Sequence, residues 1–391
     1  MGGPLEGVVV LEVANYIAGP YAGLLLVDLG AEVIKVEHPD GGDPFRAWDL
    51  GGDQPTFWAY NRGKRSLTLD LRAPGGVEVF YRLVERADVV LENLRPGAME
   101  RLGVGWEQLR ARNPRLIYCS VTGFGPTGPY RDRPAYDGVG QSLSGLLSLL
   151  TPRDRPQHVG PNFSDSLAGA FGAYGILAAL LARERTGRGQ RVDTSLVGAT
   201  IAFLIAPATE ALATGTPPGP LSRPTASQTY AWVAADGLPL TVHLSAPQKF
   251  WEGLLRAVER LDLLEDERFR TRAARRRNYL ALRDELAPVF ATRPRAEWLA
   301  RLAANEVPHA PIYDLCEVFA DPQVRHMGLE IAIPRPGRPP VRTVRGGVDF
   351  SATVPPLPGP PPELGEHTDT LLARAGYTAA EIAALRARHV I

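Results

Sequence analysis

Short apolar runs alternate with helix-like segments in the first half of the chain, and this alternation restricts the fold more than any other feature. The run 7–13 (GVVVLEV) precedes a loop, an apolar helical segment and a second run at 31–37 (AEVIKVE). Two more helical stretches each lead into an apolar run: 76–86 into 87–93, and 105–112 into 115–121. Continuous apolar strands that alternate with helices favour a parallel sheet covered on both faces. The sequence therefore predicts an α/β fold.

Further helices are expected at 136–150, at 165–186 and near 195–213, with a strand at RVDTS after the helix stop GRGQ. The longest apolar stretch, 167–182, falls just short of the roughly 17 to 25 residues that span a bilayer. We therefore predict that it is a buried core helix, and we expect no membrane association.

The second half of the chain predicts a smaller domain between two irregular stretches. Asp236-Gly237 lies between two strand-like runs, which is a hairpin signal, and Arg-rich helices follow. The Pro/Arg-rich stretch 331–362 is predicted to be irregular and extended across a surface, because proline cannot donate to a sheet. The predicted organisation is a large domain at 1–213, a linker at 214–228, a small domain at 229–325, and a return linker with the C-terminal part of the large domain at 326–391.

Composition narrows the function classes. Lys+Arg and Asp+Glu both number 43, so the net charge of zero gives no reason to expect nucleic acid or an anionic membrane as a partner. The two cysteines, Cys119 and Cys316, have no metal-ligand spacing, and HExxH, GxSxG and Walker patterns are missing, so we expect no metal site. The N-terminus lacks the pattern of a secretion signal, which predicts a cytoplasmic protein.

Several segments are candidates for contact with an anion. The loop NYIAGPYAG (15–23) lacks the GxGxxG spacing of nicotinamide-binding proteins, but a loop that enters a helix at the edge of a parallel sheet can bind anions. The cluster NRGKR (61–65) either pairs with phosphate or forms a solvated face. The glycines of GFGPTGP (123–129) suit a ligand or simple turns. Arg275, Arg276 and Arg277 are predicted to lie on the surface.

Asp165 is the candidate nucleophile. It precedes the most apolar helix of the chain, so its position alone predicts an N-cap. In a dry pocket, a carboxylate at a helix start would keep its charge through the helix dipole while losing competing water. Such a group can attack a thioester, because the leaving thiolate has a conjugate thiol with a pKa of about 8.5.

These segments together resemble the class III CoA-transferases, the family that includes formyl-CoA transferase, carnitine CoA-transferase and alpha-methylacyl-CoA racemase. The resemblance covers nearly the whole chain and rests on the ordered segments 18–46, 61–71, 87–103, 113–137, 164–196 and 364–369. It implies a Rossmann-like large domain built from both chain ends, a small α+β middle domain, and a homodimer of interlocked rings.

The resemblance also implies the substrates and the site. Coenzyme A would enter as an acyl-CoA thioester and leave on a carboxylic acid, with Asp165 as the nucleophile. His38 would lie near the adenine, and Arg72 and Arg101 would hold phosphates. The implied coenzyme A contacts are Tyr16, Ile17, Ala18, His38, Leu69, Arg72, Asn93, Leu94 and Arg101.

Two alternatives remain open at this point: an alpha-methylacyl-CoA racemase, and a non-catalytic CoA-binding protein. The racemases use a His where this chain has Tyr136, and a Glu where it has Ala246. A phenol with a pKa of about 10 is a poor general base, so transfer is favoured and Tyr136 is predicted to orient the acyl group. Formyl-CoA transferases have a Gln at the position of Ile17 and a Gly-rich flap where this chain has Arg223 to Gln228, so formyl or oxalate specificity is not expected.

Overall fold

The computed structural model describes residues 2–48 and 54–391. The described residues divide into two units. The larger unit comprises Met1–Leu147, His158–Ala208 and Gly328–Ile391, and the smaller unit comprises Ser148–Gln157 and Thr209–Met327. Both ends of the chain therefore belong to the larger unit.

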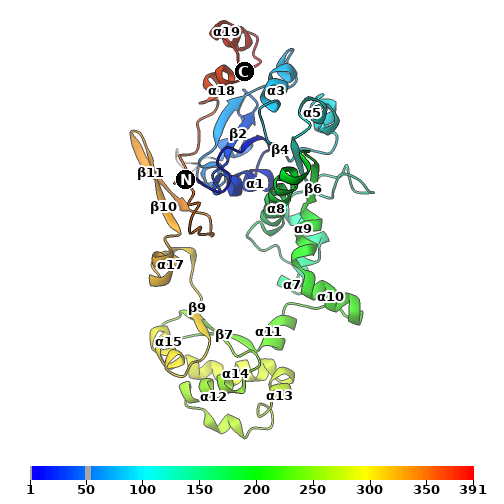
Figure 1. Cartoon of the computed structure of the whole chain (residues 1–391). Helices are drawn as coiled ribbons and strands as arrows, with labels where there is room; N and C mark the ends of the chain where they lie inside the picture. The colour runs from blue at the N-terminus through cyan, green and yellow to red at the C-terminus, as the bar shows by residue number, and fades with distance from the viewer. Residues whose placement is uncertain (1, 49–53) are drawn as a thin grey trace. The chain divides into compact units, whose positions relative to one another are not determined.

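A parallel sheet forms the centre of the larger unit (Figure 1). Among the described residues it has six strands in the order β3-β2-β1-β4-β5-β6, and every neighbouring pair is parallel. The strands are β1 (Val9–Val13), β2 (Glu32–Glu37), β3 (Arg65–Thr68), β4 (Val89–Glu92), β5 (Ile117–Thr122) and β6 (Arg191–Ser195). The predicted α/β fold with a parallel sheet is confirmed. From β1, the strands β2 and β3 are added on one side of the sheet, and β4, β5 and β6 on the other. Proteins with such sheets bind ligands at this reversal point of the strand order, between β1 and β4.

Helices cover both faces of the sheet because successive strand residues point to opposite sides. Leu11 of β1 belongs to one apolar core and Val10 to the other. The first core lies under α3 (Gly76–Val84), α5 (Trp106–Arg112), α18 (Thr368–Arg374) and α19 (Ala379–Ala387). The second core lies under α1 (Ala18–Val27), α8 (Phe163–Thr186) and α9 (Leu196–Phe203).

Helix α8 packs against α1 through Gly169. A Cβ atom at Gly169 would lie only 2.6 Å from the backbone oxygen of Ala18, so a larger residue would push the two helices apart. The prediction of a buried core helix is wrong for its other face, since Tyr174 is 69% exposed and Leu181 is 65% exposed. The helix is long and apolar enough to span a membrane, and 39% of its most apolar window is buried in the chain.

Two predicted helices are interrupted. The candidate at 136–150 forms α6 (Asp137–Leu143) and α7 (Leu146–Leu150), because Gly145 adopts a φ of 85° that no helix continues through. The candidate near 195–213 forms α9 and α10 (Ile205–Thr214), which are bent by 78° relative to each other.

The prediction for 331–362 is wrong in its first part. Strands β10 (Glu330–Arg335) and β11 (Arg338–Val344) form an antiparallel hairpin. Its turn holds Pro336 and Gly337, with a φ of 68° at the glycine. Both strands of a two-stranded sheet are edges, so prolines fit wherever the N–H would point outward. The following stretch, 345–367, contains no helix or strand.

The smaller unit combines an antiparallel sheet with helices. Strands β7 (Thr229–Val233) and β8 (Pro239–His243) form the expected hairpin around Asp236-Gly237, and β9 (His309–Pro311) pairs with β8. Its helices include α11 (Ser222–Ser227), which lies within the predicted linker, and α12 (Gln248–Ala257), α13 (Arg272–Arg277), α14 (Tyr279–Phe290) and α15 (Arg295–Ala304). The shorter helices are η2 (Leu261–Leu264), α16 (Leu315–Val318) and α17 (Pro322–Met327).

The surface prediction for the three consecutive arginines is wrong for Arg275. Its side chain is only 1% exposed, donates to Gln228 Oε1 at 2.7 Å and to the Phe269 carbonyl at 2.9 Å, and lies over the Trp251 ring. Arg276 and Arg277 are exposed as expected. Successive residues of a helix point in different directions, so one of the three arginines of α13 points inward. There, carbonyl and amide oxygens of the smaller unit accept its hydrogen bonds.

Candidate active site

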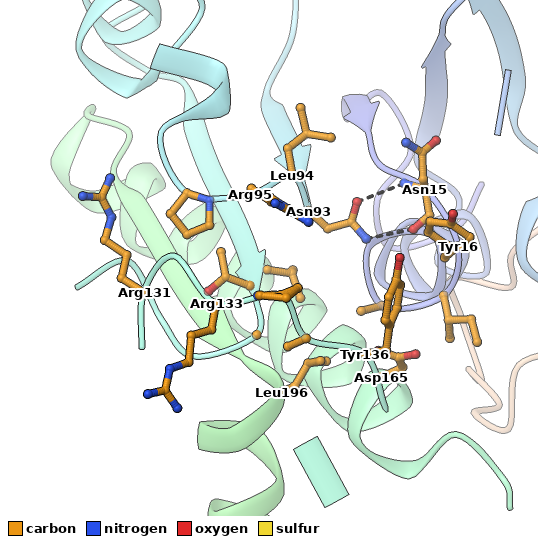
Figure 2. Close-up of a pocket in the computed structure, with 18 residues that line it drawn as sticks. Asn15, Tyr16, Asn93, Leu94, Arg95, Arg131, Arg133, Tyr136, Asp165 and Leu196 are labelled. Carbon is orange, nitrogen blue, oxygen red and sulfur yellow. Dashed lines mark hydrogen bonds between the residues drawn. The ribbon is translucent and has the colours of Figure 1, made fainter. Parts of the chain in front are cut away.

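A pocket of about 260 Å³ opens in the larger unit at the carboxyl ends of β1, β4 and β5 (Figure 2). This is the reversal point of the strand order, where three loops diverge. The pocket is lined by Asn15, Tyr16, Ile17, Ala18, Asn93, Leu94, Arg95, Pro96, Val121, Thr122, Gly123, Arg131, Arg133, Pro134, Ala135, Tyr136, Asp165 and Leu196. Seven residues predicted from the sequence therefore share this pocket: Tyr16, Ile17, Ala18, Asn93, Leu94, Tyr136 and Asp165.

Asp165 is the third residue of α8, so the prediction that it is the N-cap is wrong. The N-cap position belongs to Asn162. Asp137 satisfies the helix start from another element, since its Oδ1 accepts from the backbone N–H of Ser164 at 2.8 Å and of Asp165 at 3.3 Å. The Asp165 carboxylate is thereby left available to the pocket.

Burial, and then the charge of Asp137, raise the pKa of Asp165 to about 7. This direction is opposite to the expectation that the helix start keeps the carboxylate charged. A group with a pKa near the ambient pH is about half protonated, and it loses its negative charge over the next pH unit below. A carboxyl group with so strongly perturbed a pKa in a pocket is typical of a functional site.

Tyr16 and Tyr136 form an aromatic wall of the pocket. Their rings meet edge to face with centroids 5.9 Å apart, and Tyr16 also meets Phe45 at 5.5 Å. Tyr16 has a φ of 65°, which is unusual for a residue with a side chain. Tyr136 is 65% exposed, so its phenol is accessible to a ligand.

A reciprocal hydrogen-bonded pair joins two of the pocket loops. The backbone N–H of Asn15 donates to Asn93 Oδ1 at 2.9 Å, and Asn93 Nδ2 donates to the Asn15 carbonyl at 2.8 Å (Figure 2). The amide of Asn93, predicted from the resemblance as a coenzyme A contact, thus also fixes the β1–α1 loop (residues 14–17) against the β4 loop.

Buried ion pairs support the β1–α1 loop from below. Lys35 Nζ contacts Glu12 at 3.1 Å and Asp43 at 2.8 Å, and it donates to the Ala14 carbonyl at 2.7 Å. Asp43 Oδ1 in turn accepts from the backbone N–H of Tyr16 at 3.4 Å. Burial lowers the pKa of Lys35, but Glu12, Asp43 and Glu37 outweigh it, and the pKa is raised.

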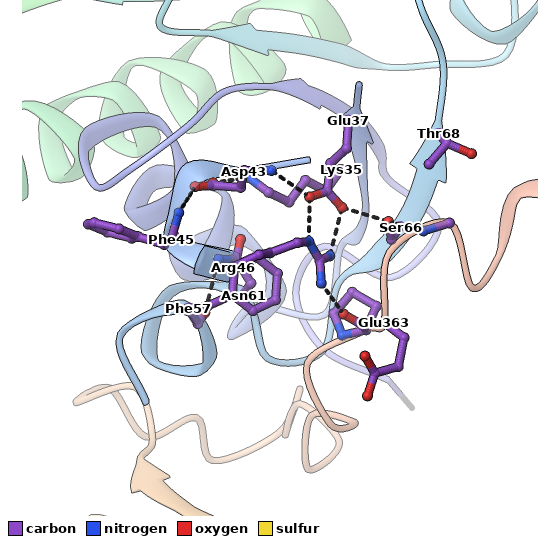
Figure 3. A network of polar contacts seen from close by, with 12 residues as sticks. Lys35, Glu37, Asp43, Phe45, Arg46, Phe57, Asn61, Ser66, Thr68 and Glu363 are labelled. Carbon is purple, nitrogen blue, oxygen red and sulfur yellow. Dashed lines mark hydrogen bonds and ion pairs between the residues drawn. The ribbon is translucent and has the colours of Figure 1, made fainter. Parts of the chain in front are cut away.

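A second set of ion pairs extends this network toward β3. Glu37 accepts from both Nε and Nη2 of Arg46 at 2.8 Å, and from the Ser66 hydroxyl at 2.6 Å (Figure 3). Arg46 lies in the short helix η1 (Pro44–Ala47), and the next helix along the chain is α2 (Pro55–Asn61).

Two basic residues of the cluster at 61–65 are buried and form ion pairs in the interior. Lys64 is buried and contacts Glu12 Oε2 at 2.7 Å, and Arg62 is buried and paired with Asp28. Burial lowers the pKa of Lys64 to about 8, although Glu12 opposes the shift. Both interpretations of the cluster, a phosphate site and a solvated face, are wrong for these two residues.

A second pocket of about 190 Å³ contains three more of the predicted residues, namely His38, Leu69 and Arg72. Asn15 borders both pockets, so the second pocket lies next to the first. Among the described residues, Arg101 of α4 (Ala98–Arg101) lines neither pocket and is exposed.

Three arginines of the first pocket were missed by the sequence reasoning: Arg95, Arg131 and Arg133. Arg95 follows Asn93 and Leu94 directly, and the other two lie in the segment that contains Tyr136, so their proximity to predicted residues was the available signal. Figure 2 shows the guanidinium groups of Arg131 and Arg133 extending away from Asp165. In the part of the chain that the structure describes, no group of three or more His, Cys, Asp or Glu side chains is arranged to hold a metal ion.

The fold and the pocket together define an α/β protein with a ligand site at the reversal point of a parallel sheet and a carboxyl nucleophile candidate in that site. The sequence model of CoA-transferase family III matches residues 5–368. The chain belongs to this family and is an enzyme of the CoA-transferase class. The resemblance inferred from the sequence is confirmed.

Curated relatives cover nearly the whole chain. It is 36% identical over 382 residues to succinate–glutarate CoA-transferase of Agrobacterium fabrum, which covers 95% of each chain. It is 35% identical to succinyl-CoA–D-citramalate CoA-transferase of Chloroflexus aurantiacus, over 99% of this chain and 98% of that protein. Among solved structures, a CAIB/BAIF family protein from Brucella suis matches with a TM-score of 0.86 and 38% identity, over 96% of this chain and 100% of that one.

Proposed function

We propose that this enzyme transfers coenzyme A from an acyl-CoA thioester to a carboxylic acid, with Asp165 as the nucleophile. The observation that carries the proposal is the position of the Asp165 carboxyl group. It is partly buried, it lines the pocket beside Tyr136, and burial together with Asp137 raises its pKa to about 7. A partly desolvated carboxylate is a stronger nucleophile than one surrounded by water.

In the proposed reaction the Asp165 carboxylate attacks the thioester carbonyl carbon. The C–S bond breaks, and the coenzyme A thiolate leaves with the bonding electron pair, giving an acyl-aspartyl anhydride. The thiolate then attacks the aspartyl carbonyl, which releases the donor acid as its carboxylate and leaves an aspartyl-CoA thioester. The acceptor carboxylate repeats both steps in reverse order, so that coenzyme A leaves on the acceptor and the Asp165 carboxylate is restored.

The other predicted residues have roles that the pocket geometry supports. Tyr136 orients the acyl group beside Asp165. Tyr16 and Ile17 of the β1–α1 loop, together with Ala18 at the start of α1, contact the pantetheine arm. The second pocket takes the adenosine phosphate end of coenzyme A, with His38 near the adenine and Leu69 and Arg72 around it. The pocket residues Asn93 and Leu94 contact the arm, and exposed Arg101 contributes a positive charge for a phosphate.

We propose a dicarboxylic acid as donor or acceptor. The named relatives act on succinate, glutarate and D-citramalate. Dicarboxylic acids carry a second carboxylate that needs a cationic partner, and guanidinium groups bind carboxylates in a two-pronged geometry. Arg131 and Arg133, which line the pocket, are able to supply one.

An exchange assay tests the proposed reaction. Succinyl-CoA incubated with labelled glutarate should give labelled glutaryl-CoA and free succinate in equal amounts, as measured by mass spectrometry. Parallel incubation of 2-methylacyl-CoA in deuterated water tests the racemase alternative, because racemisation exchanges the α proton and transfer does not. Deuterium uptake without any acid-dependent exchange would replace the transferase proposal.

We further propose a homodimer of interlocked subunits, supported by large apolar side chains that are exposed on α8 and α9. Tyr174, Leu181 and Phe203 are each more than half exposed on these helices. Exposed apolar patches of this kind mark protein interfaces. Light scattering should return twice the mass of one chain, and Leu181→Glu should lower that mass or the yield of soluble protein. A monomer mass for the unmodified protein at micromolar concentration would contradict the proposal.

A further inference from the structure

Asp137 holds the start of α8 although it belongs to another helix. It is the first residue of α6, and its Oδ1 accepts from the backbone N–H groups of Ser164 and Asp165. Its Oδ2 accepts from Gln141 Nε2, and Gln141 is only 2% exposed. Both carboxylate oxygens are therefore occupied, so the side chain is fixed with its negative charge close to the backbone of Asp165.

Several elements around Asp165 contribute titratable or charged groups. Helix α6 contributes Asp137, helix α2 contributes Tyr60, and the pocket loops contribute Tyr16 and Tyr136. Burial and then the charge of Asp165 raise the pKa of Tyr60, so this phenol stays neutral at physiological pH.

The remaining phenol of the β1–α1 loop behaves similarly, since burial and then Tyr136 raise the pKa of Tyr16. The arginines that line the pocket are Arg95, Arg131 and Arg133. After burial, the negative charge of Asp137 is what raises the pKa of the Asp165 carboxyl.

On the basis of the proposed function, we propose that Asp137 is a positioning residue that fixes the nucleophile and, through its own negative charge, favours the covalent states of Asp165 over the free carboxylate. In the free enzyme two carboxylates lie at the start of α8, since Asp137 binds the backbone N–H of Asp165. In the aspartyl-CoA thioester Asp165 has no charge, because the negative charge has left on the donor acid. Repulsion is relieved in that state, and the equilibrium between free and acylated enzyme shifts toward acylation.

The same repulsion makes proton binding compete with acylation, because a proton also removes the charge of Asp165. The free enzyme should therefore gain activity as the pH rises through about 7, the value to which burial and Asp137 raise the pKa of Asp165. Above that pH the Asp165 carboxylate is ionised, so its repulsion by Asp137 favours acylation to the full extent.

Asp137→Asn tests the proposal, since asparagine keeps an oxygen that accepts from Ser164 and Asp165 but carries no charge. We expect the acid limb of the pH profile of kcat/KM to move down by about half to one pH unit. At pH 8.5, the equilibrium ratio of aspartyl-CoA enzyme to free enzyme, at fixed succinyl-CoA and succinate, should fall by about threefold to tenfold. Intact-protein mass spectrometry after rapid quenching measures this ratio.

Two further variants separate the charge of Asp137 from its hydrogen bonds. Asp137→Ser keeps a capping oxygen without a charge, so the acid limb of kcat/KM and the ratio of aspartyl-CoA enzyme to free enzyme should shift as in Asp137→Asn. The serine variant also serves as the test if the asparagine variant fails to fold. Glu184→Gln removes one charge near the other end of α8, about 28 Å away, and should leave both readouts unchanged. An unshifted acid limb and an unchanged ratio in the Asp137 variants would overturn the proposal. Absence of any aspartyl-CoA adduct in the unmodified enzyme would instead overturn the proposed function.

Discussion

Replacing Asp165 with alanine should lower the rate of coenzyme A transfer by a factor of about 10⁴ or more, because no other group in the pocket can form the anhydride and the thioester. The pocket around it keeps its shape, since Asp137 rather than Asp165 caps α8. Binding of free coenzyme A, measured by calorimetry, should therefore stay within about threefold of the unmodified enzyme. Transfer that persists at more than a tenth of the normal rate would remove Asp165 from the mechanism.

Asp165→Asn separates loss of chemistry from loss of folding. The folded-state pKa of about 7 lies above the ordinary value of 3.8 for an aspartate, so the folded protein holds this proton more tightly than the unfolded chain. The stability from the protonated carboxyl is complete below about pH 4 and is lost as the pH rises through 7. The asparagine variant stays neutral and should be more stable than the unmodified enzyme at pH 8, by about 2 to 4 kcal/mol, and equally stable near pH 4. An inactive but more stable protein at pH 8 would show both effects together.

Local patterns in the sequence were sufficient for strands β1, β2, β4, β5 and β6, whereas β3 (Arg65–Thr68) was not predicted because its short segment was interpreted as part of a basic cluster. Apolar runs mark buried parallel strands, and loops that follow such strands meet at one edge of the sheet. Tyr16 after β1 and Asn93 after β4 follow such strands, but the resemblance was what placed both of them in the site. Asp165 could be placed there only through the resemblance, because nothing local distinguishes it from a helix cap.

The features that the sequence did not predict depend on contacts between distant residues. Asp137 caps a helix that begins 26 residues further along the chain, at Phe163, and no local pattern predicts such a cap. Arg275 was assigned to the surface because its buried oxygen partners, Gln228 and the Phe269 carbonyl, come from other elements. The hairpin at 330–344 was missed because its prolines were weighed above its Pro-Gly turn.

Glu12 determines whether the charges beneath the β1–α1 loop are balanced, and its loss should have the largest effect on stability. Its carboxylate is 0% exposed and contacts Lys35 Nζ at 3.1 Å and Lys64 Nζ at 2.7 Å. The same ammonium groups donate to the carbonyls of Ala14 and Pro20, at both ends of the segment that lines the pocket. A Cβ atom at Gly23 would lie 1.9 Å from Glu12 Oε2, so the glycine makes room for this carboxylate.

Glu12→Ala should lower the free energy of unfolding of the larger unit by about 3 to 5 kcal/mol, because it leaves two buried ammonium groups with one remaining carboxylate, Asp43. Denaturant unfolding measured at pH 7 gives this value. As a matched control, Glu32→Ala on the neighbouring strand removes a carboxylate that also pairs with two cations, Arg65 and Arg374, but at the surface. That change should cost less than about 1 kcal/mol, since solvent screens exposed pairs.

A double variant, Glu12→Leu with Lys64→Met, distinguishes unbalanced charge from lost packing. It removes one negative and one positive group and leaves Lys35 paired with Asp43, so the interior stays neutral. Replacing a buried ion pair with apolar residues of similar size is often neutral or stabilising, whereas removing one partner is not. The double variant should therefore recover at least about half of the stability that Glu12→Ala loses. It should not recover full transfer activity, because the Lys64 bond to the Pro20 carbonyl is gone and the pocket segment is held at one end only. Glu12→Leu alone keeps the volume but leaves the charges unbalanced, and it should stay about as unstable as Glu12→Ala. If Glu12→Leu instead recovers as much stability as the double variant, the carboxylate acts through its volume and not through its charge.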